Sequence, residues 1–120
     1  MSRTLGRSGI KVSDIGFGCW AIGGPFTLDG RPDGWGEVDD AQSTAAVASA
    51  LDQGITFFDT ADVYGAGHSE RVLGQALAGR REDAVIATTC RPPGRKRWRW
   101  PPVNSTTWPA SAAARWRWAC

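Results

Sequence analysis

The sequence predicts an α/β fold built on a parallel sheet, because strand-like and helical segments alternate along its first 88 residues. Short runs with strand character occur at residues 15–20, 55–58 and 83–88, and a segment with an apolar stripe lies between each pair. Alternation of strand, helix and strand is the repeating unit of parallel α/β sheets. A length of 120 residues is enough for one modest domain.

The first third of the chain predicts a hairpin, a strand and a loop, in that order. Residues 6–9 read Gly-Arg-Ser-Gly, which is typical of a hairpin turn between two short strands. The strand at residues 15–20 contains two glycines, where another backbone or a ligand can approach closely. Residues 23–37 are rich in Gly, Pro and Asp, so we expect a loop with Phe26 and Trp35 as its apolar anchors.

Capping residues and apolar stripes predict two helices. Asp39 or Asp40 can cap a first helix that runs to about residue 53, where a glycine follows. Ser69 is the expected N-cap of a second helix, which Gly79 would end. The small apolar faces of both segments suit packing against a sheet.

Composition changes abruptly near residue 90. Residues 1–90 hold all 12 acidic residues and half of the 14 Lys and Arg, whereas residues 91–120 hold the remaining cations, no acid and most of the tryptophans. The second stretch lacks Leu, Ile, Phe and Met, so no buried face can be drawn on it. We therefore expect a folded domain at residues 1–89 and a disordered basic tail at residues 90–120.

Cysteine usage and hydropathy exclude several classes of protein. The three cysteines form no CxxC pair and the chain has one histidine, so we expect neither a zinc site nor any other metal site, and no disulfide framework. No apolar run reaches the roughly 18 residues needed to span a bilayer, and the N-terminus lacks a signal-peptide core. A cytoplasmic protein is the expectation.

Residues 55–70 contain the candidate active site. A run of β-branched and aromatic residues leads to Asp59, where we expect the strand to emerge into a loop, and Tyr64 follows five positions later. Tyr64 is the only tyrosine in the chain. Catalytic groups of α/β barrels lie at that end of a strand.

This segment closely resembles the active-site signature of the aldo-keto reductases, whose Asp, Tyr, Gly and Ser-Glu pattern is matched by Asp59, Tyr64, Gly65, Ser69 and Glu70. The resemblance covers residues 3–88 without an evident gap. It implies NADPH-dependent reduction of aldehydes or ketones. It also implies a partial (β/α)8 TIM barrel with an N-terminal hairpin and about three strand-helix units, since a whole barrel needs about 250 residues.

The resemblance assigns roles to individual residues. Tyr64 would donate a proton to the carbonyl oxygen with Asp59 as its electrostatic partner, and Cys19, Trp20 and Asp59 would contact the nicotinamide end of the cofactor. Thr89 occupies the position of the family's catalytic lysine, whose positive charge would favour the phenolate. The later histidine and the strands that hold the cofactor phosphates would lie beyond the C-terminal residue. We therefore expect a truncated chain with little or no turnover.

Other interpretations remain open for these residues. Taken alone, Asp59 and Tyr64 would be a strand-terminal turn residue and a half-buried aromatic, and Cys19 with Trp20 could serve only packing. His68 is expected to be a solvated loop residue rather than a group at the site mouth. The glycines around residue 18 match a loose dinucleotide fingerprint, but no helix follows them directly, so we reject it.

The tail suggests a second class of function. Cations alternate with tryptophans at residues 95–100 and 115–118, a pattern that could stack on single-stranded nucleic acid or settle on an anionic membrane. The alternative that we favour is a shifted reading frame in GC-rich coding sequence, which would produce the same composition. A non-catalytic fragment with a binding tail is the competing hypothesis.

Overall fold

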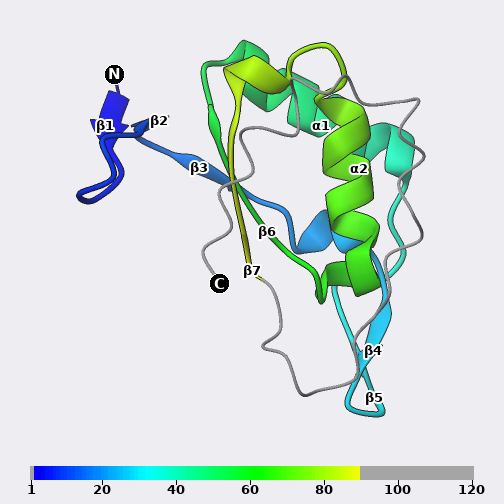
Figure 1. Ribbon diagram of the computed structural model, residues 1–120. Coiled ribbons are helices and arrows are strands. Elements are labelled where there is room, and N and C mark those ends of the chain that lie inside the picture. Colours follow the sequence, from blue (N-terminus) through cyan, green and yellow to red (C-terminus); the bar gives the residue numbers. More distant parts are fainter. Residues whose placement is uncertain (1, 90–120) are drawn as a thin grey trace.

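The computed structural model describes residues 2–89, and the predictions made for the basic tail lie outside the described residues. Figure 1 shows the order of the elements along the chain. They are β1 (Ser2–Thr4), β2 (Lys11–Ser13), β3 (Gly16–Gly18), η1 (Ala21–Gly23), β4 (Phe26–Leu28), β5 (Arg31–Asp33), α1 (Asp40–Asp52), β6 (Phe57–Ala61), η2 (Tyr64–Gly67), α2 (His68–Ala76), η3 (Arg81–Asp83) and β7 (Val85–Thr89).

Three strands form a parallel sheet in the order β3-β6-β7, as the sequence predicts. Gly18 pairs with Asp59 on β6, and Asp59 pairs in turn with Ala87 on β7. The chain crosses from β3 to β6 through α1 and from β6 to β7 through α2, and both helices lie on the same side of the sheet (Figure 1). Neighbouring strands joined by helical crossovers are the arrangement of a barrel wall, and three such strands make a partial barrel.

The hydrophobic core lies between this sheet and the two helices. Phe58, in the middle strand, is fully buried and its ring centroid lies 5.8 Å from that of Phe17 on β3. The helices add Val47 from α1 and Leu73 from α2, with exposed fractions of 0% and 1%. The buried cluster comprises Cys19, Ile22, Val47, Ala50, Leu51, Phe58, Val72, Leu73, Leu77 and Ala84.

The opposite face of the sheet is largely open. Side chains alternate between the two faces of a strand, so Asp59 lies on the face opposite Phe58 and Thr60. The strand register places Gly18 and Thr89 on that same face. Gly18, Asp59 and Thr89 are all exposed, whereas Phe58 and Thr60 are buried.

Several local predictions are confirmed. The N-terminal hairpin forms between β1 and β2. Reciprocal hydrogen bonds of 2.9 and 3.0 Å between Ser13 and Thr56 fasten it to the start of β6. Asp39 is the N-cap of α1, because its carboxylate accepts a 2.9 Å hydrogen bond from the backbone N–H of Gln42.

Other predictions are corrected. The segment that we expected to be a plain loop contains the hairpin β4–β5, with Pro32 inside β5. The second parallel strand begins and ends later than predicted, so Asp59 lies within β6 rather than in the following loop. Ser69 is not a helix cap, because α2 begins at His68 and its N-cap is Gly67, whose φ of 89° favours glycine.

None of the helices in the described part of the chain is long and apolar enough to cross a bilayer.

Candidate active site

The carboxyl ends of the parallel strands bring most of the candidate residues to one edge of the sheet. The backbone N–H of Cys19 donates a 2.8 Å hydrogen bond to the carbonyl of Asp59, which extends the pairing of β3 with β6. On the other side, the N–H of Asp62 donates a 3.2 Å hydrogen bond to the carbonyl of Thr89. The carboxyl ends of β3, β6 and β7 therefore lie beside one another.

The backbone of Asp59 is held by neighbouring strands on both sides. It lies in the central strand, paired on both sides, and its carboxylate is on the open face. Thr89 pairs with Ala61, so its side chain lies on the same face as that of Asp59, two residues further toward the strand ends. The position that the resemblance gives to a catalytic lysine thus lies on the face of Asp59, and a neutral hydroxyl is present there.

Tyr64 is the first residue of η2, and its ring stacks on the indole of Trp20. The two ring centroids are 6.0 Å apart with an interplanar angle of 22°. Trp35 contacts the indole of Trp20 edge-on, with a distance of 5.6 Å between the ring centroids and an interplanar angle of 79°. Both geometries are favourable for aromatic pairs. Trp20 and Trp35 remain 39% and 68% exposed, so the array forms a surface rather than a core.

A close backbone contact fixes the loop that carries Tyr64. A Cβ atom placed on Gly23 would lie 2.9 Å from the carbonyl carbon of Tyr64. A Cβ placed on Gly65, whose φ is 59°, would lie 2.7 Å from the carbonyl carbon of Gly23. Side chains cannot occupy either position without moving backbone, so the two glycines allow η1 and η2 to touch.

Cys19 is placed differently from the other candidates. Its side chain is fully buried in the core cluster, and burial, aided by the negative charge of Asp59, raises the pKa of the thiol to about 12. The thiol is therefore neutral and points away from solvent. Any contact of Cys19 with a cofactor must come from its main chain.

Ser69 connects three elements beneath the site. Its hydroxyl donates a 2.6 Å hydrogen bond to the carbonyl of Cys19 and lies 3.0 Å from the hydroxyl of Thr60. Because its single proton is engaged by the carbonyl, Thr60 must donate to Ser69. The end of β3, the middle of β6 and the first turn of α2 are thus tied together in a fully buried place.

Glu70, the neighbour of Ser69, makes a similar connection to β7. The Thr88 hydroxyl donates a 2.7 Å hydrogen bond to Oε1 of Glu70, whereas Oε2 is buried and has no hydrogen-bond partner among the described residues. Burial raises the pKa of the Glu70 carboxyl, and the charge of Asp62 raises it further, while the Thr88 hydrogen bond opposes the shift.

His68 corrects the expectation of a solvated loop residue. It is the first residue of α2, and its side chain is 28% exposed. Nδ1 lies 2.9 Å from the carbonyl oxygen of Gly23, and Nε2 lies 2.9 Å from Oδ2 of Asp40 at the start of α1. No local sequence signal indicates these contacts, because their partners are 45 and 28 residues away.

The surface next to Asp59 is open at Gly18. A Cβ placed on Gly18 would meet no atom within 4 Å, so a ligand can approach the backbone there closely. Trp20, two residues further along the same segment, is 39% exposed. Residues 2–89 contain no group of three His, Cys, Asp or Glu side chains that could hold a metal ion.

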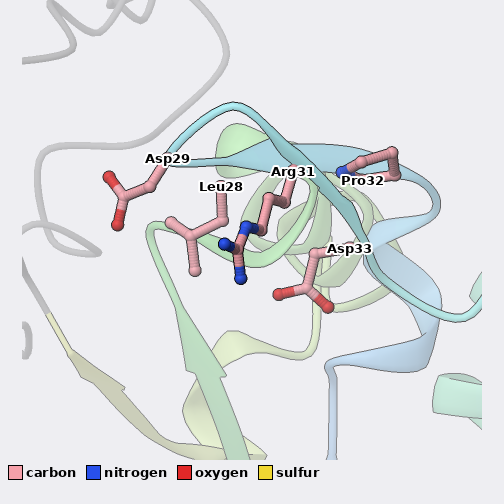
Figure 2. A pocket seen from close by; sticks show the side chains of 5 residues that line it. All are labelled: Leu28, Asp29, Arg31, Pro32 and Asp33. Atoms are coloured by element: carbon pink, nitrogen blue, oxygen red, sulfur yellow. The ribbon is translucent and has the colours of Figure 1, made fainter.

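A shallow groove lies under the hairpin β4–β5, which projects from the same end of the molecule as the carboxyl ends of the strands (Figure 1). Figure 2 shows the side chains of Leu28, Arg31 and Asp33 pointing to one side of the hairpin. None of the candidate residues lines this groove, which is formed by Leu28, Asp29, Arg31, Pro32 and Asp33.

Comparison with known proteins identifies similar chains. The model of the aldo/keto reductase family matches residues 14–115. The aldo-keto reductase YhdN of Bacillus subtilis is 41% identical over 87 residues, which cover 71% of this chain and 24% of that protein. This chain therefore spans about a quarter of the length of that relative.

Solved structures agree with this similarity. The aldo-keto reductase AKR11C1 of Bacillus halodurans, in its holo form, has a TM-score of 0.60 and 33% identity over 84% of this chain and 30% of its own. An aldo-keto reductase of Klebsiella pneumoniae in complex with NADPH has a TM-score of 0.52 and 32% identity, and covers 65% of this chain and 24% of its own.

Proposed function

Since the chain belongs to the aldo/keto reductase family, we propose that residues 2–89 form the N-terminal part of an active site for the NADPH-dependent reduction of aldehydes or ketones. The observation that carries the proposal is the position of Tyr64. Its ring stacks on the indole of Trp20. Cys19, the residue before Trp20, donates a backbone hydrogen bond to the carbonyl of Asp59. A phenol and a carboxylate thus belong to connected segments at the carboxyl ends of parallel strands, where barrel enzymes place their chemistry.

In this proposal Tyr64 donates the proton that neutralises the developing alkoxide of the substrate. A reduced nicotinamide would supply the hydride when bound. Asp59 presents its carboxylate on the open face and would orient the groups around the phenol, while the exposed part of Trp20 would help to hold the nicotinamide end of the cofactor. The stack with Trp20 restricts the rotation of Tyr64, so that its hydroxyl is held in one direction.

Thr89 makes the chain a weak catalyst in our proposal. The threonine lies on the same face as Asp59 and carries no charge, so nothing at that position stabilises the phenolate that remains after proton transfer. We therefore propose that these 120 residues turn over little or no substrate by themselves. The cytoplasmic location stays a prediction.

The test restores the missing charge. Thr89→Lys, made in the full 120-residue chain, should raise the rate of NADPH oxidation with a reactive aromatic aldehyde. Tyr64→Phe in that background should lower it by a factor of about 10² to 10⁴, the usual contribution of general acid catalysis. NADPH binding should be measured separately by cofactor fluorescence, so that binding and chemistry are distinguished.

A matched control is Ala45→Lys, which adds the same charge at an exposed position of α1, on the helix-covered side of the sheet. It should leave the rate unchanged. Absence of NADPH binding by the unsubstituted chain and by the Thr89→Lys variant would remove the proposal for this polypeptide. Equal rates with and without the Tyr64 hydroxyl would remove Tyr64 as the proton donor.

A further inference from the structure

His68 is in contact with two elements that start far from it in the sequence. It opens α2, and its ring reaches the carbonyl oxygen of Gly23 at the end of η1 and the carboxylate of Asp40 at the start of α1, each at 2.9 Å. It is the only histidine in the chain. Neither the core nor the proposed chemistry of Tyr64 accounts for this pair of contacts.

Both partners of the ring can only accept hydrogen bonds. A carbonyl oxygen has no proton to donate, and neither has an ionised carboxylate. A neutral imidazole has one N–H, so it can satisfy one of the two partners, whereas the imidazolium has two. The two contacts are made together only when both ring nitrogens carry a proton.

The Gly23 carbonyl belongs to the segment that supports the aromatic pair. The N–H of Gly23 donates a 3.0 Å hydrogen bond to the carbonyl of Trp20, which closes the turn of η1. The Cα of Gly23 faces the backbone of Tyr64 so closely that a Cβ atom there would lie 2.9 Å from its carbonyl carbon. A displacement of Gly23 must therefore move Trp20, Tyr64 or both.

We propose that His68, in its protonated form, is a positioning residue that fastens η1 to the start of α1 and so keeps Trp20 stacked on Tyr64. The proposal deepens the proposed function, because the stack holds the suggested proton donor. Loss of one ring proton releases either the Gly23 carbonyl or the Asp40 carboxylate. Release of Gly23 removes one of the contacts that fix the separation of the aromatic pair, and release of Asp40 frees the ring from α1.

The elements packed around the ring carry several titratable groups. The segment Ala21–Gly23 adds no titratable side chain. The groups on the other elements are Asp39, Asp40 and Asp52 on the α1 side, Tyr64 on η2, and Glu70 and Arg71 in the first turn of α2.

The test observes the ring directly in the full 120-residue chain. Histidine labelled with ¹⁵N gives two ring signals that belong to one residue, and their shifts report which nitrogens carry a proton. The indole N–H of Trp20, assigned through Trp20→Phe, is followed in the same pH titration. We expect both ring nitrogens to be protonated at the acidic end, and the Trp20 signal to shift together with the loss of a ring proton.

Two carboxylate variants separate the ion pair from a general effect of charge. Asp40→Asn removes the negative partner, so the response of Trp20 to His68 titration should shrink. Asp52→Asn removes an exposed carboxylate of the same helix, which pairs with Arg80 instead, and should leave the response unchanged. Equal responses in both variants would overturn the role of Asp40.

Substitution of the ring itself gives a second readout. His68→Arg keeps two or more donors and should preserve the Trp20 shift of the acidic form, whereas His68→Leu should give the released shift at every pH. If His68→Leu does not fold, the titration of the unsubstituted chain provides the test.

A Trp20 signal that does not change as His68 is titrated, or a ring with one protonated nitrogen throughout, would contradict the proposal. None of these readouts requires NADPH or turnover, so they can succeed or fail independently of the proposed reaction.

Discussion

The two faces of the parallel sheet differ: along one strand, residues that face the core alternate with residues that face the proposed site. Phe58 and Thr60 are buried against the helices, with exposed fractions of 0% and 2%, while Asp59 between them is exposed on the other face. The helix-covered face holds the core and a connected set of polar groups. The open face holds Asp59 and Thr89, with open space around Gly18 beside Asp59.

Because the core and the proposed site lie on opposite faces, we expect that stability and the proposed site can be changed separately in this chain. Substitutions that shorten side chains on the covered face should destabilise the domain, because the closely packed core cannot fill the cavity that they leave. Substitutions on the open face should alter the site and leave folding nearly unchanged. Neighbouring residues of one strand therefore serve as matched pairs for experiments.

The largest effect is expected from Phe58→Ala. The ring is fully buried, and truncation of such a ring costs about 3 to 5 kcal/mol of unfolding free energy. Phe57→Ala, one residue earlier and partly exposed on the other face, should cost clearly less. Urea unfolding followed by circular dichroism measures both. Similar losses for the two variants would mean that the two faces do not differ in packing.

A smaller loss is expected from Ser69→Ala. Removal of this hydroxyl leaves the Cys19 carbonyl and the Thr60 hydroxyl without their shared partner in a buried place, which should cost about 1 to 3 kcal/mol. The control is Ser49→Ala, which removes an exposed hydroxyl that bonds only locally to Gln53 on α1, and should change stability by less than about 0.5 kcal/mol. A Ser69 variant as stable as the control would show that the connection contributes nothing.

The smallest effect concerns Glu70 and pH. Because burial raises its pKa in the folded state, the folded chain binds this proton more readily than the unfolded chain. The contribution of Glu70 to stability should therefore fall as pH rises from its ordinary value of 4.5 toward the raised folded value, and stay low above it. Glu70→Gln should remove this part of the pH dependence while its amide oxygen still accepts from Thr88.

The midpoint of urea unfolding, measured between pH 4 and pH 8 for Glu70→Gln and the unsubstituted chain, checks this sign. Glu82→Gln, which changes an exposed carboxylate within η3, is the matched control and should leave the pH profile unchanged. A stability difference between Glu70→Gln and the unsubstituted chain that is constant across this range would contradict the assignment to Glu70.

The sequence predicts those elements whose signals are local. Asp39 caps α1 through a partner three residues away, and the apolar stripes of both helices are visible in short windows. The hairpin β4–β5 was missed because Pro32 and its glycine turn have the composition of a loop, while its strands are held by each other. The late end of β6 depends on pairing with β7, which extends to Ala61 and Thr89.

The candidate site shows the same contrast between local signals and contacts with distant residues. Asp59 and Tyr64 could be proposed from the resemblance to the family signature, because both lie in one continuous segment of the sequence. The connections through His68 and Ser69 could not, since their partners lie 28 to 50 residues away along the chain. The buried orientation of Cys19 also depends on tertiary packing, which a lone cysteine in a sequence does not reveal.

The most direct test of the central claim is a map of backbone amide shifts in the 120-residue chain as NADPH is added. The account predicts that the changes concentrate on the open face and its strand ends, at Gly18, Trp20 and Asp59. Amides on the helices of the covered side, such as those of Val47 and Leu73, should remain in place. Changes confined to other residues, or none at millimolar cofactor, would contradict the assignment of the open face as the site.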